Sequence, residues 1–272
     1  MNGAVKYFVF DVESVADGAL VSRLRYPGEN RTPEEAIARW REKLMTETGK
    51  DFIPYTYHIP TAVVLAKVTE KYELVDMVGL GEANYRPHEI VETFWRGWEK
   101  YGRPVFVTFN GRGFDVPLLE LSAFRYGVSI PGWFSPLGRN YEQPRNRYNQ
   151  NAHIDLCDVL TNFGSTHFTG GLNLAANLIG KPGKMDVQGA MVQDMHDAGQ
   201  FQEIEDYCRC DVLDTYFVFL RTRVLMGLLS IHEEQKLVER TKAWLTERAG
   251  ENLGYRTYLA SWGDWQNPWI SK

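Results

Sequence analysis

The chain has few cysteines and no long apolar segment. Only Cys157, Cys208 and Cys210 are present among 272 residues. With the scattered histidines they suit neither a disulfide framework nor a four-ligand zinc site, so we expect reduced, structural thiols. No run of about eighteen apolar residues occurs, and the start, MNGAVKYFVF, lacks a basic region followed by an apolar stretch. These absences predict a cytoplasmic protein that is neither secreted nor inserted in a membrane.

An excess of basic residues is also missing. The chain has 30 Lys and Arg against 35 Asp and Glu, a formal net charge of −5, which argues against indiscriminate attraction to nucleic acid. A nucleic-acid enzyme is not excluded, because a local basic surface suffices for binding. With 44% hydrophobic and 13% aromatic residues, the chain can bury one large core and fits one domain with additions. No second catalytic domain, repeat or low-complexity segment is expected.

Two carboxylates interrupt an apolar run near the start of the chain. Residues 5–14, VKYFVFDVES, are predicted to form a central strand. Asp11 and Glu13 are two residues apart, so their side chains point to the same face of that strand. Neighbouring like charges repel unless a cation lies between them, and magnesium prefers carboxylate and water oxygens. The pair therefore indicates a site for a hard divalent ion.

A third carboxylate, Asp115, follows a second apolar strand at residues 104–110. It begins a predicted helix, DVPLLELSAFRYG, whose apolar positions are expected at Val116, Leu119 and Phe124. Carboxylates are favoured at helix starts, and an N-cap role alone would explain this one. Only the other clusters make Asp115 a candidate for the same site.

The last cluster lies in a long predicted helix, residues 203–227. Tyr207 and Asp211 are one helical turn apart on the same side. A phenol so placed can bond the water held by an ion on the aspartate, although a packed tyrosine and an ordinary helix aspartate would explain this pair alone. The buried stripe of this helix is expected at Val212, Leu213, Tyr216, Phe217 and Leu220.

Taken in order, these motifs resemble the DEDD exonuclease superfamily: Asp-x-Glu at Asp11, Asn-x-x-x-Phe-Asp ending at Asp115, and Tyr-x-x-x-Asp ending at Asp211. The middle motif looks like the version in family B DNA polymerases. The stretch from residue 153 onward is similar to the stand-alone bacterial predicted 3′–5′ exonucleases related to the proofreading domain of those polymerases, and the whole resemblance covers roughly residues 5–225. The histidine branch of the superfamily has His where this chain has Asp206, so Tyr207 indicates the tyrosine branch, DEDDy.

The resemblance implies a ribonuclease-H-like α/β fold, a mixed central sheet flanked by helices. It implies hydrolysis of single-stranded nucleic acid, DNA favoured, from the 3′ end to nucleoside 5′-monophosphates. Two Mg²⁺ or Mn²⁺ ions are implied, with Asp11 bridging both, Glu13 and Asp211 completing one, and Asp115 acting through water on the other. Tyr207 would orient the attacking water, because a phenol with a reference pKa of roughly 10 is a poor base.

Substrate contacts are expected from two places. Asn110 and Phe114 belong to the middle motif. Residues 133–151, WFSPLGRNYEQPRNRYNQN, form a predicted loop rich in arginine and tyrosine, between the helix after Asp115 and the strand HIDLC. Arginines can hold phosphates and rings can stack on unpaired bases, although an ordinary solvated loop is an equal alternative. The residues singled out in this loop are Arg139, Arg145, Arg147 and Tyr148, with Tyr141 beside them.

The remaining pattern predicts how the chain is organised. Thr32, Pro33 and Glu35 announce a helix within an insertion at about residues 17–58. Residues 61–80 predict a hairpin that turns at 70–73, residues 89–102 a helix, and residues 153–157 a final strand. Together these give the mixed sheet covered by helices. We expect an exonuclease domain at residues 1–230, with a C-terminal helix and Trp-rich tail at 231–272 packed on it.

Several residues with chemical potential are assigned structural roles. The tryptophans of the tail could stack bases or bind a partner, but packing on the domain is favoured. The strand with His153, Asp155 and Asp158 is expected at the far side of the cleft, and an aspartate after a strand is commonly a helix cap. The isolated histidines His58, His167 and His196 are assigned to the surface or to packing.

Other functions stay open. The substrate could be RNA, because no motif encodes the contacts to the 2′-hydroxyl that separate RNA from DNA. The chain could hydrolyse small phosphodiesters or oligonucleotides, or be a catalytically silent nucleic-acid-binding module. A homo-oligomer or a replication or repair partner is possible, and neither these nor processivity can be read from the sequence.

Overall fold

The computed structural model describes residues 4–81, 84–183 and 191–269. Its centre is a five-stranded sheet with the order β3-β2-β1-β4-β5. The strands are β1 (Val5–Ala16), β2 (His58–Thr69), β3 (Leu74–Leu80), β4 (Val105–Thr108) and β5 (His153–Asp155). β1 pairs antiparallel with β2 and parallel with β4, so antiparallel and parallel halves meet at β1. The predicted mixed sheet and its early hairpin are confirmed.

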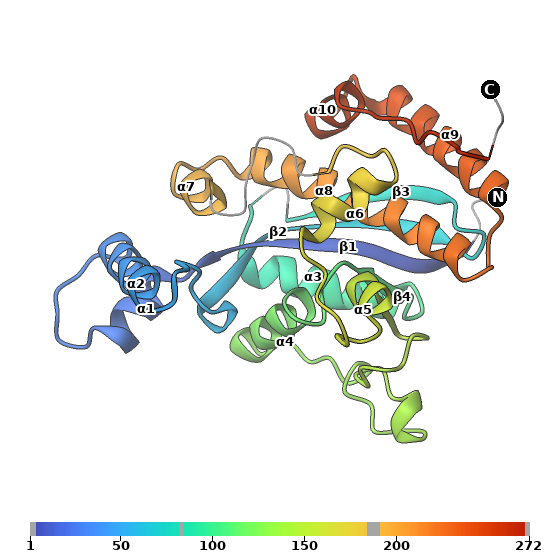
Figure 1. Ribbon diagram of the computed structural model, residues 1–272. Coiled ribbons are helices and arrows are strands. Elements are labelled where there is room, and N and C mark those ends of the chain that lie inside the picture. Colours follow the sequence, from blue (N-terminus) through green and yellow to red (C-terminus); the bar gives the residue numbers. More distant parts are fainter. Residues whose placement is uncertain (1–3, 82–83, 184–190, 270–272) are drawn as a thin grey trace.

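Helices cover both faces of this sheet (Figure 1). On one side, α3 (Pro87–Lys100) and α4 (Asp115–Tyr126) bury an aromatic core that includes Phe10 of β1 and Phe106 of β4. On the other side, α8 (Phe201–Leu225) packs on β1 and β2 with aliphatic residues such as Val9 and Val64. The alternation along β1 explains this division, because successive side chains enter opposite cores.

The structure corrects the predicted faces of two helices. Val116 and Leu119 of α4 are buried, but Phe124 is 85% exposed because it lies on the opposite side of the helix. The predicted stripe of α8 is buried, yet so are charged residues on its other faces, among them Arg209. The reason is that α8 lies between the sheet and two further helices, α9 (Ile231–Arg248) and α10 (Leu253–Ala260).

The predicted insertion forms a helical arm that projects to the left in Figure 1. It consists of α1 (Gly18–Arg25) and α2 (Pro33–Thr48), followed by the 3₁₀ turn η1 (Tyr55–Tyr57). Thr32 and Glu35 make the reciprocal capping contacts that begin α2, as the sequence predicted. A small core that includes Val21, Trp40 and Ile53 holds the arm together.

The final predicted strand is shorter than expected. β5 ends at Asp155, whose carboxylate caps α5 (Leu156–Thr161) by accepting from the Cys157 backbone N–H at 3.0 Å. This confirms the predicted cap. The chain then forms α6 (Gly171–Leu178) and α7 (Val192–Asp197); the 3₁₀ turn η2 (Asn140–Glu142) precedes β5. All three cysteines are free thiols.

The C-terminal segment packs on α8. The Trp262 ring contacts the Phe217 ring at a centroid distance of 5.4 Å, and Arg221 lies 4.3 Å from the Trp265 ring centroid. Trp269 is 84% exposed. The division of the chain at residue 230 stays a prediction. Among the described residues, no helix is both long enough and apolar enough to cross a membrane.

Candidate metal centre and catalytic cleft

The first two candidate residues lie on the α8 side of the central strand. Asp11 pairs with Val64 and Glu13 with Ala62, both on β2. Val12, between them, is 4% exposed and belongs to the aromatic core on the opposite face. The strand period therefore places both carboxylates toward α8, as the sequence predicted. Both side chains are only partly buried, which leaves them reachable from solvent.

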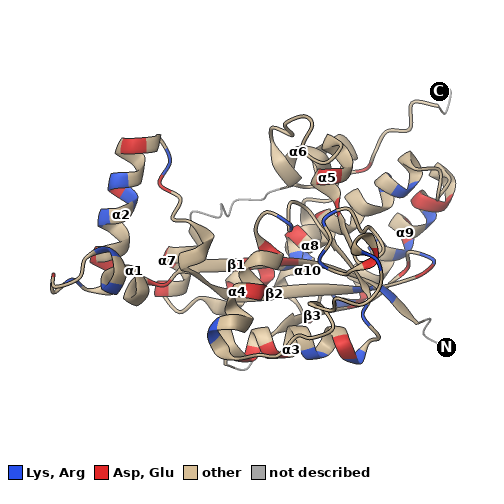
Figure 2. Ribbon diagram, turned by 90° about the horizontal axis from the view of Figure 1, so that it is seen from below, with Lys and Arg blue, Asp and Glu red and all other residues tan. Residues whose placement is uncertain are grey.

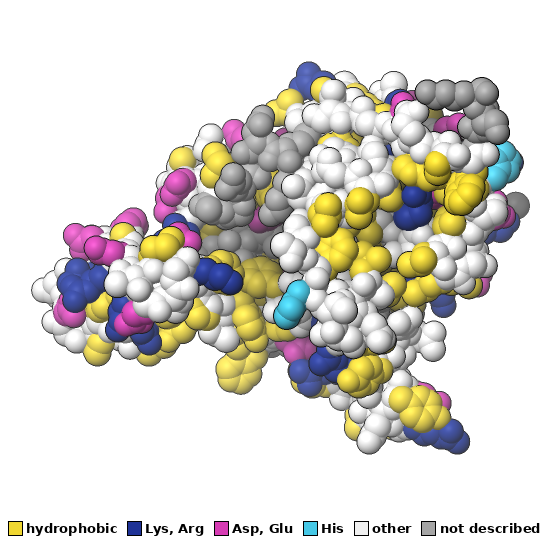
Figure 3. All heavy atoms as spheres, viewed as in Figure 1, with side chains coloured by type: hydrophobic (Ala, Val, Ile, Leu, Met, Phe, Trp, Pro, Cys, Tyr) yellow, Lys and Arg dark blue, Asp and Glu magenta, His cyan; other side chains and the backbone are white. Residues whose placement is uncertain are grey.

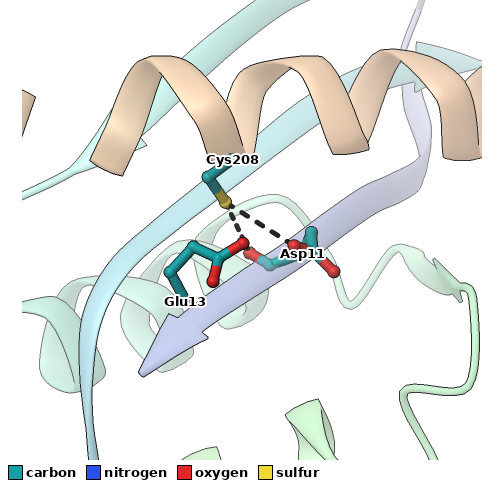
Figure 4. Close-up of side chains that lie close together, drawn as sticks. All are labelled: Asp11, Glu13 and Cys208. Carbon is teal, nitrogen blue, oxygen red and sulfur yellow. Dashed lines mark hydrogen bonds between the residues drawn. The ribbon is translucent and has the colours of Figure 1, made fainter. Parts of the chain in front are cut away.

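Beneath these carboxylates lies a thiol that the sequence did not single out. One ligand atom each of Asp11, Glu13 and Cys208 lies within 4.8 Å of the others (Figure 4). The Cys208 Sγ is 3.4 Å from the Asp11 carbonyl oxygen and 3.9 Å from Asp11 Oδ2. Cys208 is fully buried, so it packs α8 against β1. The group could hold a metal ion, with the carboxylates as the ligands that a hard cation prefers.

The loop that carries Asp115 is shaped by two backbone features. Asn110 has a positive φ of 63°, the left-handed region that asparagine tolerates better than most residues. A Cβ at Gly111 would lie 2.4 Å from Thr108 Oγ1 and 2.8 Å from Asp115 Oδ2, so only glycine fits there. The tight turn ends at Asp115, the first residue of α4, which is 4% exposed.

Asp155 holds this loop from the neighbouring strand. Its carboxylate accepts from the backbone N–H of Asn110 at 2.8 Å and of Arg112 at 2.9 Å. The Arg112 side chain in turn pairs with Asp158, with Nε 3.1 Å from Oδ2. Asp155 was predicted only as a helix cap, and its second task fixes the position of the turn that presents Asp115.

The buried Asp115 carboxyl is electrostatically unfavourable on its own. Burial raises the pKa of Asp115 well above its usual range, and the charges of Asp11 and then Asp155 raise it further. A cation between Asp11 and Asp115 would offset this repulsion. The donor set also fits, because carboxylate oxygens are the usual protein ligands of Mg²⁺ and Mn²⁺.

The third cluster meets the other two from α8. Tyr207 and Asp211 are each 6% exposed, and their side chains are hydrogen-bonded to each other. Burial raises the pKa of Tyr207 far above its ordinary value, followed by the charges of Asp211, Glu13 and Asp11. Tyr207 therefore stays a neutral phenol, a donor rather than a base.

One cleft of about 840 Å³ brings all of these side chains together. Figure 2 shows acidic positions on β1, α4 and α8 where the three elements approach one another. Residues set aside from the sequence also line it, including Asp158 and His167. Their proximity could not be read from spacing, because it depends on how the chain between β5 and α6 folds back over the cleft. The predicted residues that line the cleft are Asp11, Glu13, Asn110, Phe114, Asp115, Tyr207 and Asp211.

The predicted basic loop lies elsewhere. None of its four singled-out residues lines the cleft. Arg145 donates two hydrogen bonds of 2.8 Å to the Glu120 carboxylate, and Arg139 donates to the Tyr141 hydroxyl at 2.5 Å. Arg147 comes nearest, 3.9 Å from the cleft residue Asp158, and Tyr148 packs against Phe163. The loop is thus at most a rim of the cleft.

The sheet order and the helices on both faces define an α/β protein of the ribonuclease-H-like fold, with a carboxylate-rich cleft at its central strand. The family described as "predicted 3′-5′ exonuclease related to the exonuclease domain of PolB" matches residues 50–262, and the chain belongs to this family. The match contains the middle motif and the Tyr207–Asp211 pair, begins after Asp11 and Glu13, and ends beyond the predicted limit of residue 225. A comparison with curated proteins found no match.

Proposed function

We propose that this protein is a metal-dependent 3′–5′ exonuclease of the DEDDy type, which hydrolyses single-stranded nucleic acid, DNA favoured, to nucleoside 5′-monophosphates. The observation that carries the proposal is the convergence of four carboxylates and a phenol, from three distant parts of the chain, in one open cleft. Membership of the predicted exonuclease family supports the same reaction class. We keep the cytoplasm as the predicted compartment.

The carboxylates Asp11, Glu13, Asp115 and Asp211 would hold two Mg²⁺ or Mn²⁺ ions. When bound, such ions activate water and stabilise the leaving oxygen of a phosphoryl displacement. Tyr207, kept neutral by its surroundings, would donate or accept a hydrogen bond that orients the attacking water. Asn110 and Phe114, at the cleft wall, would contact the 3′-terminal nucleotide.

The test is a time course with 5′-labelled single-stranded DNA and RNA, side by side. We expect a ladder that shortens from the 3′ end with Mg²⁺ or Mn²⁺ and no cleavage with excess chelator. Calcium should not replace magnesium, because its larger and looser shell misplaces the water. Single strands and frayed ends should be degraded before blunt duplexes, since the cleft admits an unpaired end.

The same assay can overturn the proposal. Full activity in excess chelator would exclude the metal mechanism, and internal cuts in a circular single strand would indicate an endonuclease. Faster loss of the RNA ladder would make the protein a ribonuclease. A dinucleotide turned over as fast as a long strand would favour a hydrolase of small phosphodiesters.

The basic loop is a separate proposal for substrate holding. We expect replacement of both Arg145 and Arg147 by Ala to raise KM and to leave kcat almost unchanged. The slope of log affinity against log salt should flatten by about two, roughly one for each lost phosphate contact. Steady-state kinetics and binding at several salt concentrations measure this. Wild-type binding at every salt concentration would leave Arg145 with only its structural ion pair to Glu120.

A further inference from the structure

A second hollow adjoins the catalytic cleft on the side of the helical arm. It has a volume of about 380 Å³, within the range of roughly 300–1,000 Å³ that is usual for ligand pockets. Glu13 and Phe114 line both the hollow and the cleft, so the two spaces are continuous. Figure 3 shows the surface hollowed between the arm and the main body, with hydrophobic and basic side chains at its walls.

One wall offers an aromatic surface to solvent. Phe52, in the segment between α2 and η1, is 58% exposed. Its ring lies 5.3 Å from the His58 ring and 5.9 Å from the Phe114 ring, measured between centroids. These neighbours hold one side of the Phe52 ring and leave much of it uncovered. An exposed ring supported in this way is a platform on which a nucleobase can stack without its sequence being read.

The opposite wall supplies a positive charge. Arg41 of α2 lines the hollow, and its guanidinium makes no ion pair or hydrogen bond with any residue in the described part of the chain. His58 adds no charge, because burial lowers its pKa to about 4, and its Nδ1 is 2.9 Å from the Ser14 hydroxyl. Asp51 and Glu13 also line the hollow. Arg41 is therefore the cation that a phosphate would meet there.

We propose that this hollow binds a nucleotide of the substrate strand next to the scissile phosphate, with its base on Phe52 and a phosphate on Arg41. The inference rests on the proposed function, since it extends the same strand beyond the catalytic cleft. A phosphate and a flat ring system are the two groups that the walls complement, and continuity through Glu13 and Phe114 lets one strand occupy both spaces. Arg41 precedes the residues that match the family, so this subsite would be a property of the arm.

The experiment compares four single variants by their kinetics on a labelled oligothymidylate. Arg41→Ala and Phe52→Ala should each raise KM about tenfold, as expected for a lost phosphate or stacking contact, with kcat within about twofold of wild type. Arg41→Ala should also reduce the salt slope of binding by about one. The matched controls are Lys43→Ala, the same charge loss on α2 at a 53% exposed position, and Phe124→Ala, on the outer side of α4.

Binding of the same oligonucleotide to catalytically inactive Asp11→Asn protein, with and without the Arg41 and Phe52 changes, separates holding from turnover. Thermal unfolding checks that each variant is folded, and Phe52→Trp should restore binding because it keeps a stacking surface. The subsite is overturned if the Arg41 and Phe52 variants behave like the two controls while wild type degrades the strand. If wild type itself shows no metal-dependent degradation, the proposed function fails instead.

Discussion

Replacing Asp11 by Asn should abolish turnover of a single-stranded substrate while the protein stays folded. Asp11 lies at the meeting point of the cleft, close to Glu13, and its charge raises the pKa of Asp115. Loss of a shared metal ligand removes several kcal/mol of transition-state stabilisation, so we expect kcat/KM to fall by at least about 10³-fold. The free energy of unfolding should not fall, because the change removes a like-charge repulsion without altering the shape of the side chain.

A gel assay with Mg²⁺ or Mn²⁺, together with thermal unfolding, measures both effects. Asp76→Asn is the control, because it removes a partly exposed carboxylate of β3 that pairs with Lys67 at 2.8 Å, outside the cleft. That variant should keep wild-type activity. If Asp11→Asn cleaves at the wild-type rate, the carboxylate cluster is not the metal centre.

Tyr207→Phe should lower kcat by about 10²-fold and leave KM nearly unchanged. The change removes only the hydroxyl, which is bonded to Asp211 and which we propose to position the attacking water. Because the pKa of Tyr207 is raised far above its ordinary value, the wild-type rate should show no ionisation of a phenol base near neutral pH. The pH profiles of the two proteins should therefore have the same shape and differ in height.

Steady-state kinetics between pH 6 and 9 would test this. Tyr255→Phe is the control: its hydroxyl accepts from Arg209 at 3.4 Å on the side of α8 that faces α10, away from the cleft. The expected result for the control is an unchanged kcat with a loss of stability of about 1 kcal/mol. An equally unchanged kcat for Tyr207→Phe would remove Tyr207 from the catalytic set.

The parts of this site that follow local rules could be predicted from the sequence. A strand repeats every two residues, which placed Asp11 and Glu13 together, and a helix repeats after about four, which paired Tyr207 with Asp211. The capping signals of α2 and the turn between β2 and β3 are equally local. That the three clusters share one cleft came from their order along the chain, through the resemblance to exonucleases.

What escaped prediction depends on long-range choices between partners. Asp155 holds the Asn110 turn across 45 residues, and nothing near Asp155 in sequence announces that contact. Arg145 could have faced a phosphate, but Glu120 offers it two hydrogen bonds. The outward position of Phe124 and the hollow beside Phe52 likewise depend on packing between elements, for which apolar spacing along one helix or one loop is a weak guide.

The distribution of the site over β1, α4 and α8 has a consequence for protein synthesis. A ribosome must deliver residue 211 and the helix around it before the carboxylates of β1 acquire their last partner. Because β1 also lies between β2 and β4, its pairing awaits segments made much later, and such distant contacts form slowly. The nascent chain thus passes through most of its elongation without an assembled site, and nuclease activity arises only once the polypeptide is nearly complete.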